Sequence, residues 1–151
     1  MIQDKASLKN VRDSWKTVRV VDAQIATNMN AGIFSLVPTA TGFSVVPESL
    51  LLVFAVAVLE EVLVELEDQG TFYSRKGLKR LMEGSQSALP WQDFAAVNHA
   101  RERRNDVAHK HQFLDRGECR PFLDAIEREF IAWKILDGPV RKSYTVSLNP
   151  T

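Results

Sequence analysis

The stretch LLLVFAVAVL, Leu50–Leu59, places ten apolar residues in a row, and the pair Glu60-Glu61 follows it directly. Pro47 stands just before it and suits the first turn of a helix, because its missing N–H would have no intrahelical acceptor there. The β-branched residues also suit a buried strand, but no turn residue interrupts the segment before about Asp68, and that length favours a helix. Because this helix is apolar on every face at its start, either its own domain or a partner chain must enclose it.

The composition is typical of one domain of ordinary size. The chain has 151 residues, with 19 basic and 19 acidic side chains, so its formal net charge is zero. This balance argues against a protein that coats nucleic acid or membrane through bulk charge, and it leaves room for a local anion site. The run Leu50–Leu59 is about half of the roughly 20 residues that a membrane-spanning helix needs. Because Cys119 is the only cysteine, no intrachain disulfide can form, and we expect a cytoplasmic protein outside the membrane.

Helical periodicity predicts a long helix ahead of the apolar run and two segments behind it. The first helix is expected to stop near Asn30, and its apolar stripe consists of Leu8, Val11, Trp15, Val18, Val21 and Ile25. A short basic helical piece, SRKGLKRLME, lies between Gly70 and Gly84. A fourth helix is expected from about Trp91 to about Leu114, where Gly117 breaks it.

A fifth helix is expected to begin with Pro121 in its first turn and to end at Asp137-Gly138-Pro139. Its apolar stripe consists of Phe122, Ile126, Phe130 and Trp133. Residues 32–48 are expected to form a loop that partly covers the core, and residues 139–151 an extended or disordered tail. The sequence therefore predicts an all-α, up-and-down bundle of about five helices, in a single domain over residues 1–138.

The stretch RERRNDVAHK, Arg101–Lys110, concentrates charge in the predicted fourth helix. At about 100° per residue, one stripe of this helix is apolar except for Arg104 and His111. Its apolar members are Val97, Ala100, Val107 and Leu114, and the neighbouring polar stripe holds Asn98, Arg101, Asn105, His109 and Gln112. Burying an unpaired guanidinium is costly, so Arg104 must meet a counter-charge, open onto a cleft or face a second subunit. The simplest alternative is that Arg104 runs its stem along apolar surface and that both histidines are ordinary polar residues.

The hexapeptide RNDVAH, Arg104–His109, lies in the penultimate helix of a small all-α chain, and a short basic helix precedes it. In these features the sequence resembles the HEPN family of helical domains (higher eukaryotes and prokaryotes nucleotide-binding). The family's motif is an Arg, then a polar residue, and a His with four to six residues between Arg and His; here four intervene. The resemblance in helix order and length extends over about residues 5–137, and the hexapeptide is its specific part.

The resemblance implies a metal-independent endoribonuclease, without a cofactor, that dimerises so that two motifs face one another across a cleft. His109 would act as base toward a ribose 2′-hydroxyl, which attacks the adjacent phosphate and leaves a 2′,3′-cyclic phosphate and a 5′-hydroxyl end. Arg104 would stabilise the charge that grows on the phosphoryl oxygens. Both roles suit the side chains, because imidazole titrates near neutral pH and guanidinium offers phosphate a charged fork. Arg101 and Asn105 would support them, with Asn105 orienting His109.

The spacing of the motif also favours a homodimer. Arg104 and His109 diverge by roughly 140° around one helix, so they need not meet within one chain, and a seam between two copies could bring them together. RNA is the expected ligand, and the residues expected to bind it are Arg75, Lys76, Lys79, Arg80, Arg103 and Lys110.

One position departs from a branch of the family. In the toxins that pair with small nucleotidyltransferase antitoxins, the motif often continues with a Tyr two residues after the His, and the antitoxin modifies that Tyr. Here His111 takes this position, so His111 is either a second phosphate ligand or a packed histidine. A nucleotidyltransferase-type antitoxin remains a candidate partner.

Three other interpretations compete with the nuclease. A metal site would need His99, His109 and His111, but residues two apart on a helix point about 200° apart and cannot hold one ion. Thiol catalysis by Cys119 lacks an obvious base. The third interpretation is a helical domain without catalysis, which serves in dimerisation, nucleotide binding or as an adaptor.

Two arrangements would separate the nuclease from the domain without catalysis. A dry interface in which Arg104 bonds to Glu60 or Glu61 would favour the latter. A cleft in which the motif meets the basic residues of the short helical piece would favour the nuclease.

Overall fold

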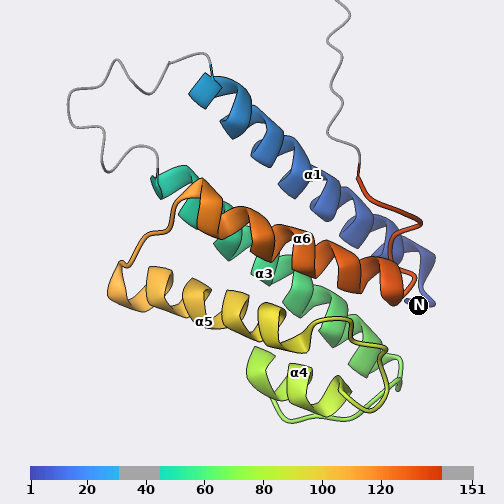
Figure 1. Ribbon diagram of the computed structural model, residues 1–151. Coiled ribbons are helices and arrows are strands. Elements are labelled where there is room, and N and C mark those ends of the chain that lie inside the picture. Colours follow the sequence, from blue (N-terminus) through green and yellow to red (C-terminus); the bar gives the residue numbers. More distant parts are fainter. Residues whose placement is uncertain (31–44, 141–151) are drawn as a thin grey trace, which may run out of the picture.

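The computed structural model describes residues 1–30 and 45–140, and within these ranges the chain forms five α-helices and no strand. They are α1 (Lys5–Asn30), α3 (Val45–Asp68), α4 (Leu78–Ser85), α5 (Phe94–Lys110) and α6 (Arg116–Ala132). The predicted all-α bundle is therefore confirmed. Four long helices run side by side, and the short α4 lies below one end of them (Figure 1). Residues 32–44 of the expected loop and 141–151 of the expected tail lie outside the described residues. Residues 45–48 belong to α3, so this part of the loop prediction is wrong.

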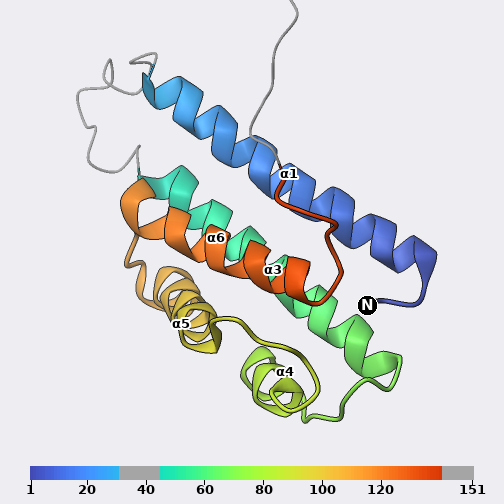
Figure 2. The ribbon, with the colours of Figure 1, turned by 45° about the vertical axis from the view of Figure 1, so that its right-hand side comes forward.

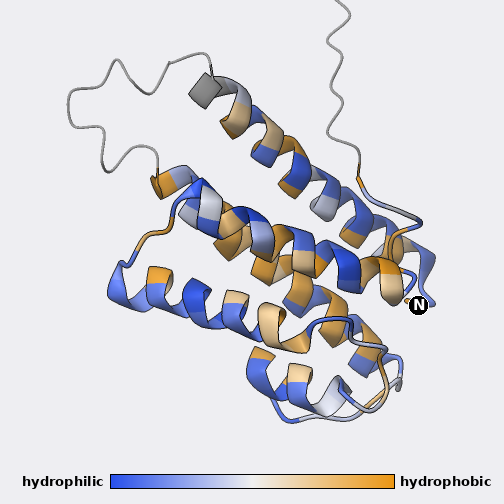
Figure 3. Ribbon diagram, in the orientation of Figure 1, coloured by the Kyte–Doolittle hydropathy of each residue, from blue (hydrophilic) through white to orange (hydrophobic). Residues whose placement is uncertain are grey.

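The helix α3 lies at the centre of the bundle and contacts α1, α4, α5 and α6 (Figures 1 and 2). Its apolar run explains this position, since Leu52, Leu59 and Leu66 are all fully buried. The prevailing orange of its ribbon in Figure 3 shows the same hydrophobicity. Pro47 lies in its first turn, as predicted. No helix of the part that the structure describes is long and apolar enough to cross a bilayer.

One stripe of α3 is left open by the rest of the domain. Leu50 is 62% exposed, Phe54 40% and Val64 38%, on the side of the helix opposite the buried Leu59. We call this surface the α3 stripe; it consists of Val46, Leu50, Phe54, Ala57, Glu61 and Val64. The described part of the domain thus encloses α3 on most of its faces and leaves the α3 stripe exposed.

The apolar stripe predicted for α1 is confirmed at its centre, where Val11, Trp15 and Val18 are fully buried. It is wrong at Val21, which is 38% exposed. The reason is that the inward face of α1 also carries charge, because Arg19 and the neighbouring Asp22 are directed toward α6 and the start of α3 and are almost completely buried.

The short basic segment is helical only in its second half. Gly77 has a φ of 103°, a backbone conformation that favours glycine, and α4 begins at the next residue. The predicted helical start at Ser74 is therefore wrong. Leu78, Leu81 and Met82 face the core, so the basic residues of α4 are directed outward.

The helix α5 is shorter than predicted at both ends. It begins at Phe94 rather than Trp91, because the Asp93 carboxylate caps it by accepting a hydrogen bond from a backbone amide of the first turn. It ends at Lys110, because His111 has a left-handed backbone conformation with a φ of 53°. The prediction that His111, Gln112 and Leu114 continue the stripes of this helix is therefore wrong.

The helix α6 begins earlier than predicted. The Asp115 carboxylate caps it, so Gly117 lies inside the helix instead of breaking the preceding one. Pro121 lies beyond the first turn, so that prediction is wrong as well. The helix ends at Ala132, before the predicted stop at Asp137, and the buried stripe is confirmed at Phe122, Ile126, Phe130 and Trp133.

Candidate functional site

A basic groove opens where α3, α5 and the start of α4 meet, with a volume of about 360 Å³. It is lined by Glu60 of α3, by the segment 76–80, and by Arg101, Arg104 and Asn105 of α5. The fold thus brings together two features that are separate in the sequence, the basic segment and the first half of the hexapeptide. Five cationic side chains face one carboxylate in this groove, an arrangement that suits an anionic ligand.

Arg104 is held in the groove by a single long ion pair among the described residues. Its side chain is 24% exposed, and its Nη2 lies 3.8 Å from Oε2 of Glu60. At that distance the two charges attract each other without a hydrogen bond. The Arg104 Nε is buried and has no hydrogen-bond partner among the described residues. Because a guanidinium carries five N–H donors, Arg104 retains donor capacity for a ligand.

Other half-buried or buried arginines are held more tightly. The preceding residue, Arg103, bonds the Glu118 carboxylate through both Nε and Nη2, and this hydrogen bonding raises the pKa of Arg103. Arg19 donates from Nε to Glu127 at 2.7 Å. The hydrogen bonds of these arginines connect two helices, whereas Arg104 makes no hydrogen bond to another helix of the described part.

Arg101 and Asn105 form the α5 side of the groove. The Arg101 side chain is 12% exposed and donates to Asn98 Oδ1 at 3.0 Å and to Glu102 Oε1 at 3.2 Å. Asn105 is half-buried and lines the groove. Within the described residues no hydrogen bond joins Asn105 to His109, so the predicted orienting role is not visible in a single chain.

The basic residues at the start of α4 lie on the opposite side of the groove. Lys79 and Arg80 share Glu83 as a partner, at 3.8 and 3.4 Å, and more than half of each basic side chain is exposed. Exposed ion pairs of this kind are weak, so both cations remain free to bind an anion. Lys76 also lines the groove, whereas the exposed Arg75 does not.

His109 lies outside the groove, in the exposed last turn of α5. In the described part of the chain its side chain makes no hydrogen bond or ion pair. Lys110 bonds Asp106 at 2.8 Å, and this hydrogen bond holds the pKa of Asp106 below its ordinary value. His111 is exposed at the end of the helix and is not a packed histidine. Within a single chain, His109, the expected base, therefore lies apart from the groove that contains Arg104.

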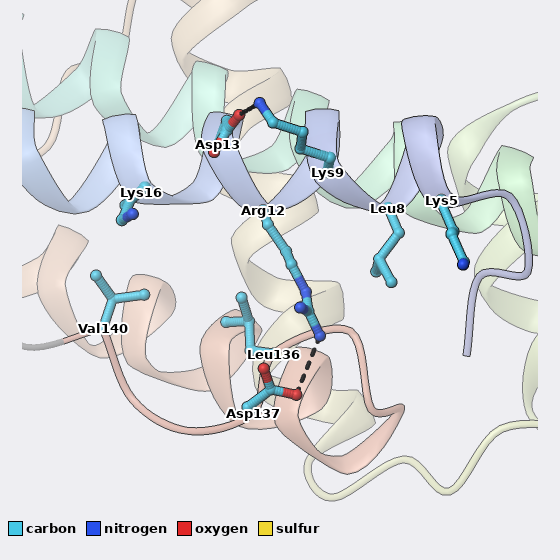
Figure 4. A pocket seen from close by; sticks show the side chains of 9 residues that line it. All are labelled: Lys5, Leu8, Lys9, Arg12, Asp13, Lys16, Leu136, Asp137 and Val140. Carbon is cyan, nitrogen blue, oxygen red and sulfur yellow. Dashed lines mark hydrogen bonds and ion pairs between the residues drawn. The ribbon is translucent and has the colours of Figure 1, made fainter.

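A second groove lies between α1 and the segment that follows α6, and Figure 4 shows its lining. Its volume is about 420 Å³. Arg12 crosses it to bond the Ile135 carbonyl at 2.7 Å and Asp137 at 3.0 Å, and Lys9 turns to Asp13. Lys5 and Lys16 also line it, but no residue of the hexapeptide or of the basic segment does, so this groove is the weaker candidate for the anion site.

Comparison with known proteins provides no relative that would assign a function. The chain matches no protein-family model, no curated protein and no solved structure. The candidate site is therefore argued from its geometry and from the hexapeptide.

A group of buried charges that the sequence pattern did not predict lies between α1, α3 and α6. Arg19, Asp22, Glu48 and Glu127 are at most 7% exposed, and Arg116 lies between Asp22 and Glu48 at 2.9 and 3.2 Å. A signal was present, because Arg19 and Asp22 stand three residues apart on the side of α1 where apolar residues were expected. These groups form ion pairs with one another and contribute to the packing of the bundle.

The thiol and metal alternatives gain nothing from the structure. Cys119 is fully buried, and burial strongly raises the pKa of its thiol. Over residues 1–30 and 45–140, no three His, Cys, Asp or Glu side chains are grouped so that they could hold a metal ion.

Proposed function

We propose that the protein is a metal-independent endoribonuclease whose active site forms between two copies of the chain in the cytoplasm. The observation that carries this proposal is Arg104: a guanidinium with unfilled donors, in a groove that four further cations line. A phosphodiester offers the acceptors that this groove lacks. Arg forms bidentate hydrogen bonds with phosphate, and such charge-assisted bonds are stronger than neutral ones.

The chemistry follows from the resemblance of the hexapeptide. His109 takes the proton from a ribose 2′-hydroxyl, and the resulting oxygen nucleophile attacks the adjacent phosphorus. The P–O bond to the 5′ oxygen of the next nucleotide breaks, and that oxygen takes up a proton. The products are a 2′,3′-cyclic phosphate and a 5′-hydroxyl end. Arg104 stabilises the negative charge on the phosphoryl oxygens during this step.

The second copy is needed because one chain keeps His109 away from the groove. The α3 stripe supports this requirement, since Leu50 and Phe54 leave an apolar surface open on α3, the helix that also carries Glu60 of the groove. A copy seated on the α3 stripe would cover this surface, and the proposal requires that its own α5 reach the groove of the first.

A helical domain without catalysis, for dimerisation, nucleotide binding or as an adaptor, is the second candidate. The contact between Arg104 and Glu60 favours it, because this is the pairing expected of a structural arginine. The length of the contact and the open groove beside it favour the nuclease over this alternative.

The test is an RNA cleavage assay in excess EDTA with the parent protein and the variants Arg104→Ala and His109→Ala. Matched controls are Arg128→Ala and His99→Ala, since both side chains are exposed and neither lines the groove. We expect the parent and both controls to leave cyclic phosphate ends, and each motif variant to lose about 100-fold in rate or more.

Circular dichroism must show that every protein in this assay is folded. If no protein cleaves any RNA tested, the nuclease is excluded and the domain without catalysis is favoured. If His109→Ala cleaves as fast as His99→Ala, the base is a different residue and the assignment of His109 is wrong.

A further inference from the structure

Glu60 is the only carboxylate among the described residues that line the basic groove. It lies on α3 and is directed at Arg104, with 41% of its side chain exposed. We propose that Glu60 is an internal competitor of the ligand, a carboxylate that a phosphate must displace from Arg104, so that Glu60 sets the affinity of the groove. This inference rests on the proposed function in one respect, that the ligand carries a phosphodiester.

The geometry of the pair favours competition over a structural tie. Where this protein fixes an arginine, it supplies short hydrogen bonds, as in the pair of Arg19 and Glu127 at 2.7 Å. The pair of Arg104 and Glu60 is 3.8 Å long and has no hydrogen bond. It therefore lowers the free energy of the unliganded groove by a small amount, which a ligand can overcome.

A bound phosphate changes the electrostatic interactions of Glu60 in two ways. The phosphate replaces Glu60 as the partner of Arg104, because it can form two hydrogen bonds with the guanidinium, whereas Glu60 forms none. Its negative charge then repels the carboxylate that remains beside it. Both effects make Glu60 a penalty on phosphate binding, and both would disappear if residue 60 were neutral.

A positioning role for Glu60 makes the opposite prediction. If the carboxylate held Arg104 ready for the ligand, its loss would weaken binding. The sign of the change in affinity therefore separates the two roles.

The experiment measures binding of a fluorescent 2′-O-methyl RNA oligonucleotide by anisotropy. This probe keeps the phosphates of RNA but lacks the nucleophilic hydroxyl, so binding is measured without cleavage. We expect Glu60→Gln to bind about threefold to tenfold more tightly than the parent. The control is Glu65→Gln, which removes the same charge from α3 but at a residue outside the groove. It should change the affinity much less.

A second arm tests whether the effect acts through Arg104. In an Arg104→Ala background, Glu60→Gln should give a clearly smaller gain, because only the repulsion between the carboxylate and the phosphate remains to be removed. An equal gain in both backgrounds would mean that Glu60 acts as a general charge. Weaker binding by Glu60→Gln, an equal gain from Glu65→Gln, or no binding by any variant would each overturn the proposal.

The two proposals fail separately. RNA cleavage by the parent together with unchanged binding by Glu60→Gln would contradict only the role of Glu60. Tighter binding by Glu60→Gln without any RNA cleavage would contradict only the nuclease.

Discussion

At the residue scale, Glu127 is the acceptor that holds the centre of α1 against α6. Its Oε2 accepts hydrogen bonds from the Trp15 indole and from the Arg19 Nε, both at 2.7 Å. All three side chains are buried. A buried charge that keeps its partner is tolerated, whereas a buried charge that loses it is costly, so the loss of one partner of this group has a large effect.

We therefore expect Glu127→Ala to lower the free energy of unfolding by about 3–5 kcal/mol, because Arg19 loses a buried partner. The matched control is Asp124→Ala, which removes the other carboxylate on α6 that Arg19 bonds; Asp124 is 46% exposed. This change should lower the same free energy by about 1 kcal/mol or less. Urea unfolding followed by circular dichroism measures both, and equal losses would contradict the role given to Glu127.

The buried Glu48 predicts a dependence of stability on pH. Burial raises its pKa above the ordinary value of 4.5, although its pairing with Arg116 opposes this change. The folded chain thus holds the proton more tightly than the unfolded chain, so Glu48 contributes a loss of stability as pH rises from 4.5 through its folded pKa. Below 4.5 this contribution is absent.

We expect Glu48→Gln to remove this contribution, since glutamine does not titrate. The difference in unfolding free energy between the variant and the parent should shift in favour of the variant between about pH 4 and about pH 7. Urea unfolding at both pH values measures it. Glu65→Gln, on the same helix but outside the α3 stripe, should follow the parent, and a Glu48→Gln variant that also follows the parent would exclude the effect.

At the scale of the elements, the end of α5 carries a backbone conformation that its residue does not favour. His111 has a φ of 53°, and the amide of the next residue, Gln112, donates to the Asp106 carbonyl at 3.2 Å to close the last turn. A side chain in this left-handed region costs on the order of 1 kcal/mol relative to glycine. The helix therefore ends where tertiary packing requires it and not where the sequence would place a helix end.

Replacing His111 with glycine should therefore stabilise the protein by about 0.5–1 kcal/mol. Glycine at His99, inside the same helix and also exposed, should destabilise it by about 1 kcal/mol. Thermal unfolding of both variants tests this contrast, and a loss of stability in His111→Gly would contradict the strain argument. In the cleavage assay, unchanged activity of His111→Gly would show that His111 is no phosphate ligand.

Periodicity in the sequence predicts the interiors of the helices but not their ends. The buried positions of Trp15, Ile126 and Phe130 follow from spacing alone, because spacing determines which face of these helices is apolar. The end of α5 at His111 does not follow from spacing, because a histidine in a left-handed backbone conformation is uncommon and no residue beside it signals a helix end. The sequence offers Glu60 and Glu61 as partners for Arg104, but the length of the contact with Glu60 depends on how α3 and α5 pack, which a single sequence does not specify.

At the scale of the whole molecule, the α3 stripe predicts the assembly. We expect Leu50→Glu and Phe54→Glu to shift the protein from dimer to monomer, because each places a charge in an apolar interface. Sedimentation velocity measures the mass, and circular dichroism checks the fold. Tyr73→Glu, which changes an aromatic residue that is 87% exposed and lies outside the stripe, should leave the dimer intact.

The same variants connect assembly with activity. If the active site forms between two copies, monomeric Phe54→Glu should lose RNA cleavage although Arg104 and His109 are intact. A monomer that still cleaves RNA would show that one chain is sufficient, and a parent that is itself monomeric would remove the basis for the shared site.

The buried charges between α1 and α6 also bear on which packings of the bundle are allowed. The apolar stripe of α1 is regular, so a shift of the helix by one turn along its axis would still place hydrophobic residues against α3. Such a shift would move Arg19 away from Glu127 and leave both charges buried without a partner, which is far more costly than a change of apolar neighbours. Arg19 thus sets the register of α1, as a polar residue within an apolar seam does in a coiled coil. The regular apolar stripe packs α1 against the bundle, and the buried charges select one position of α1 along its axis.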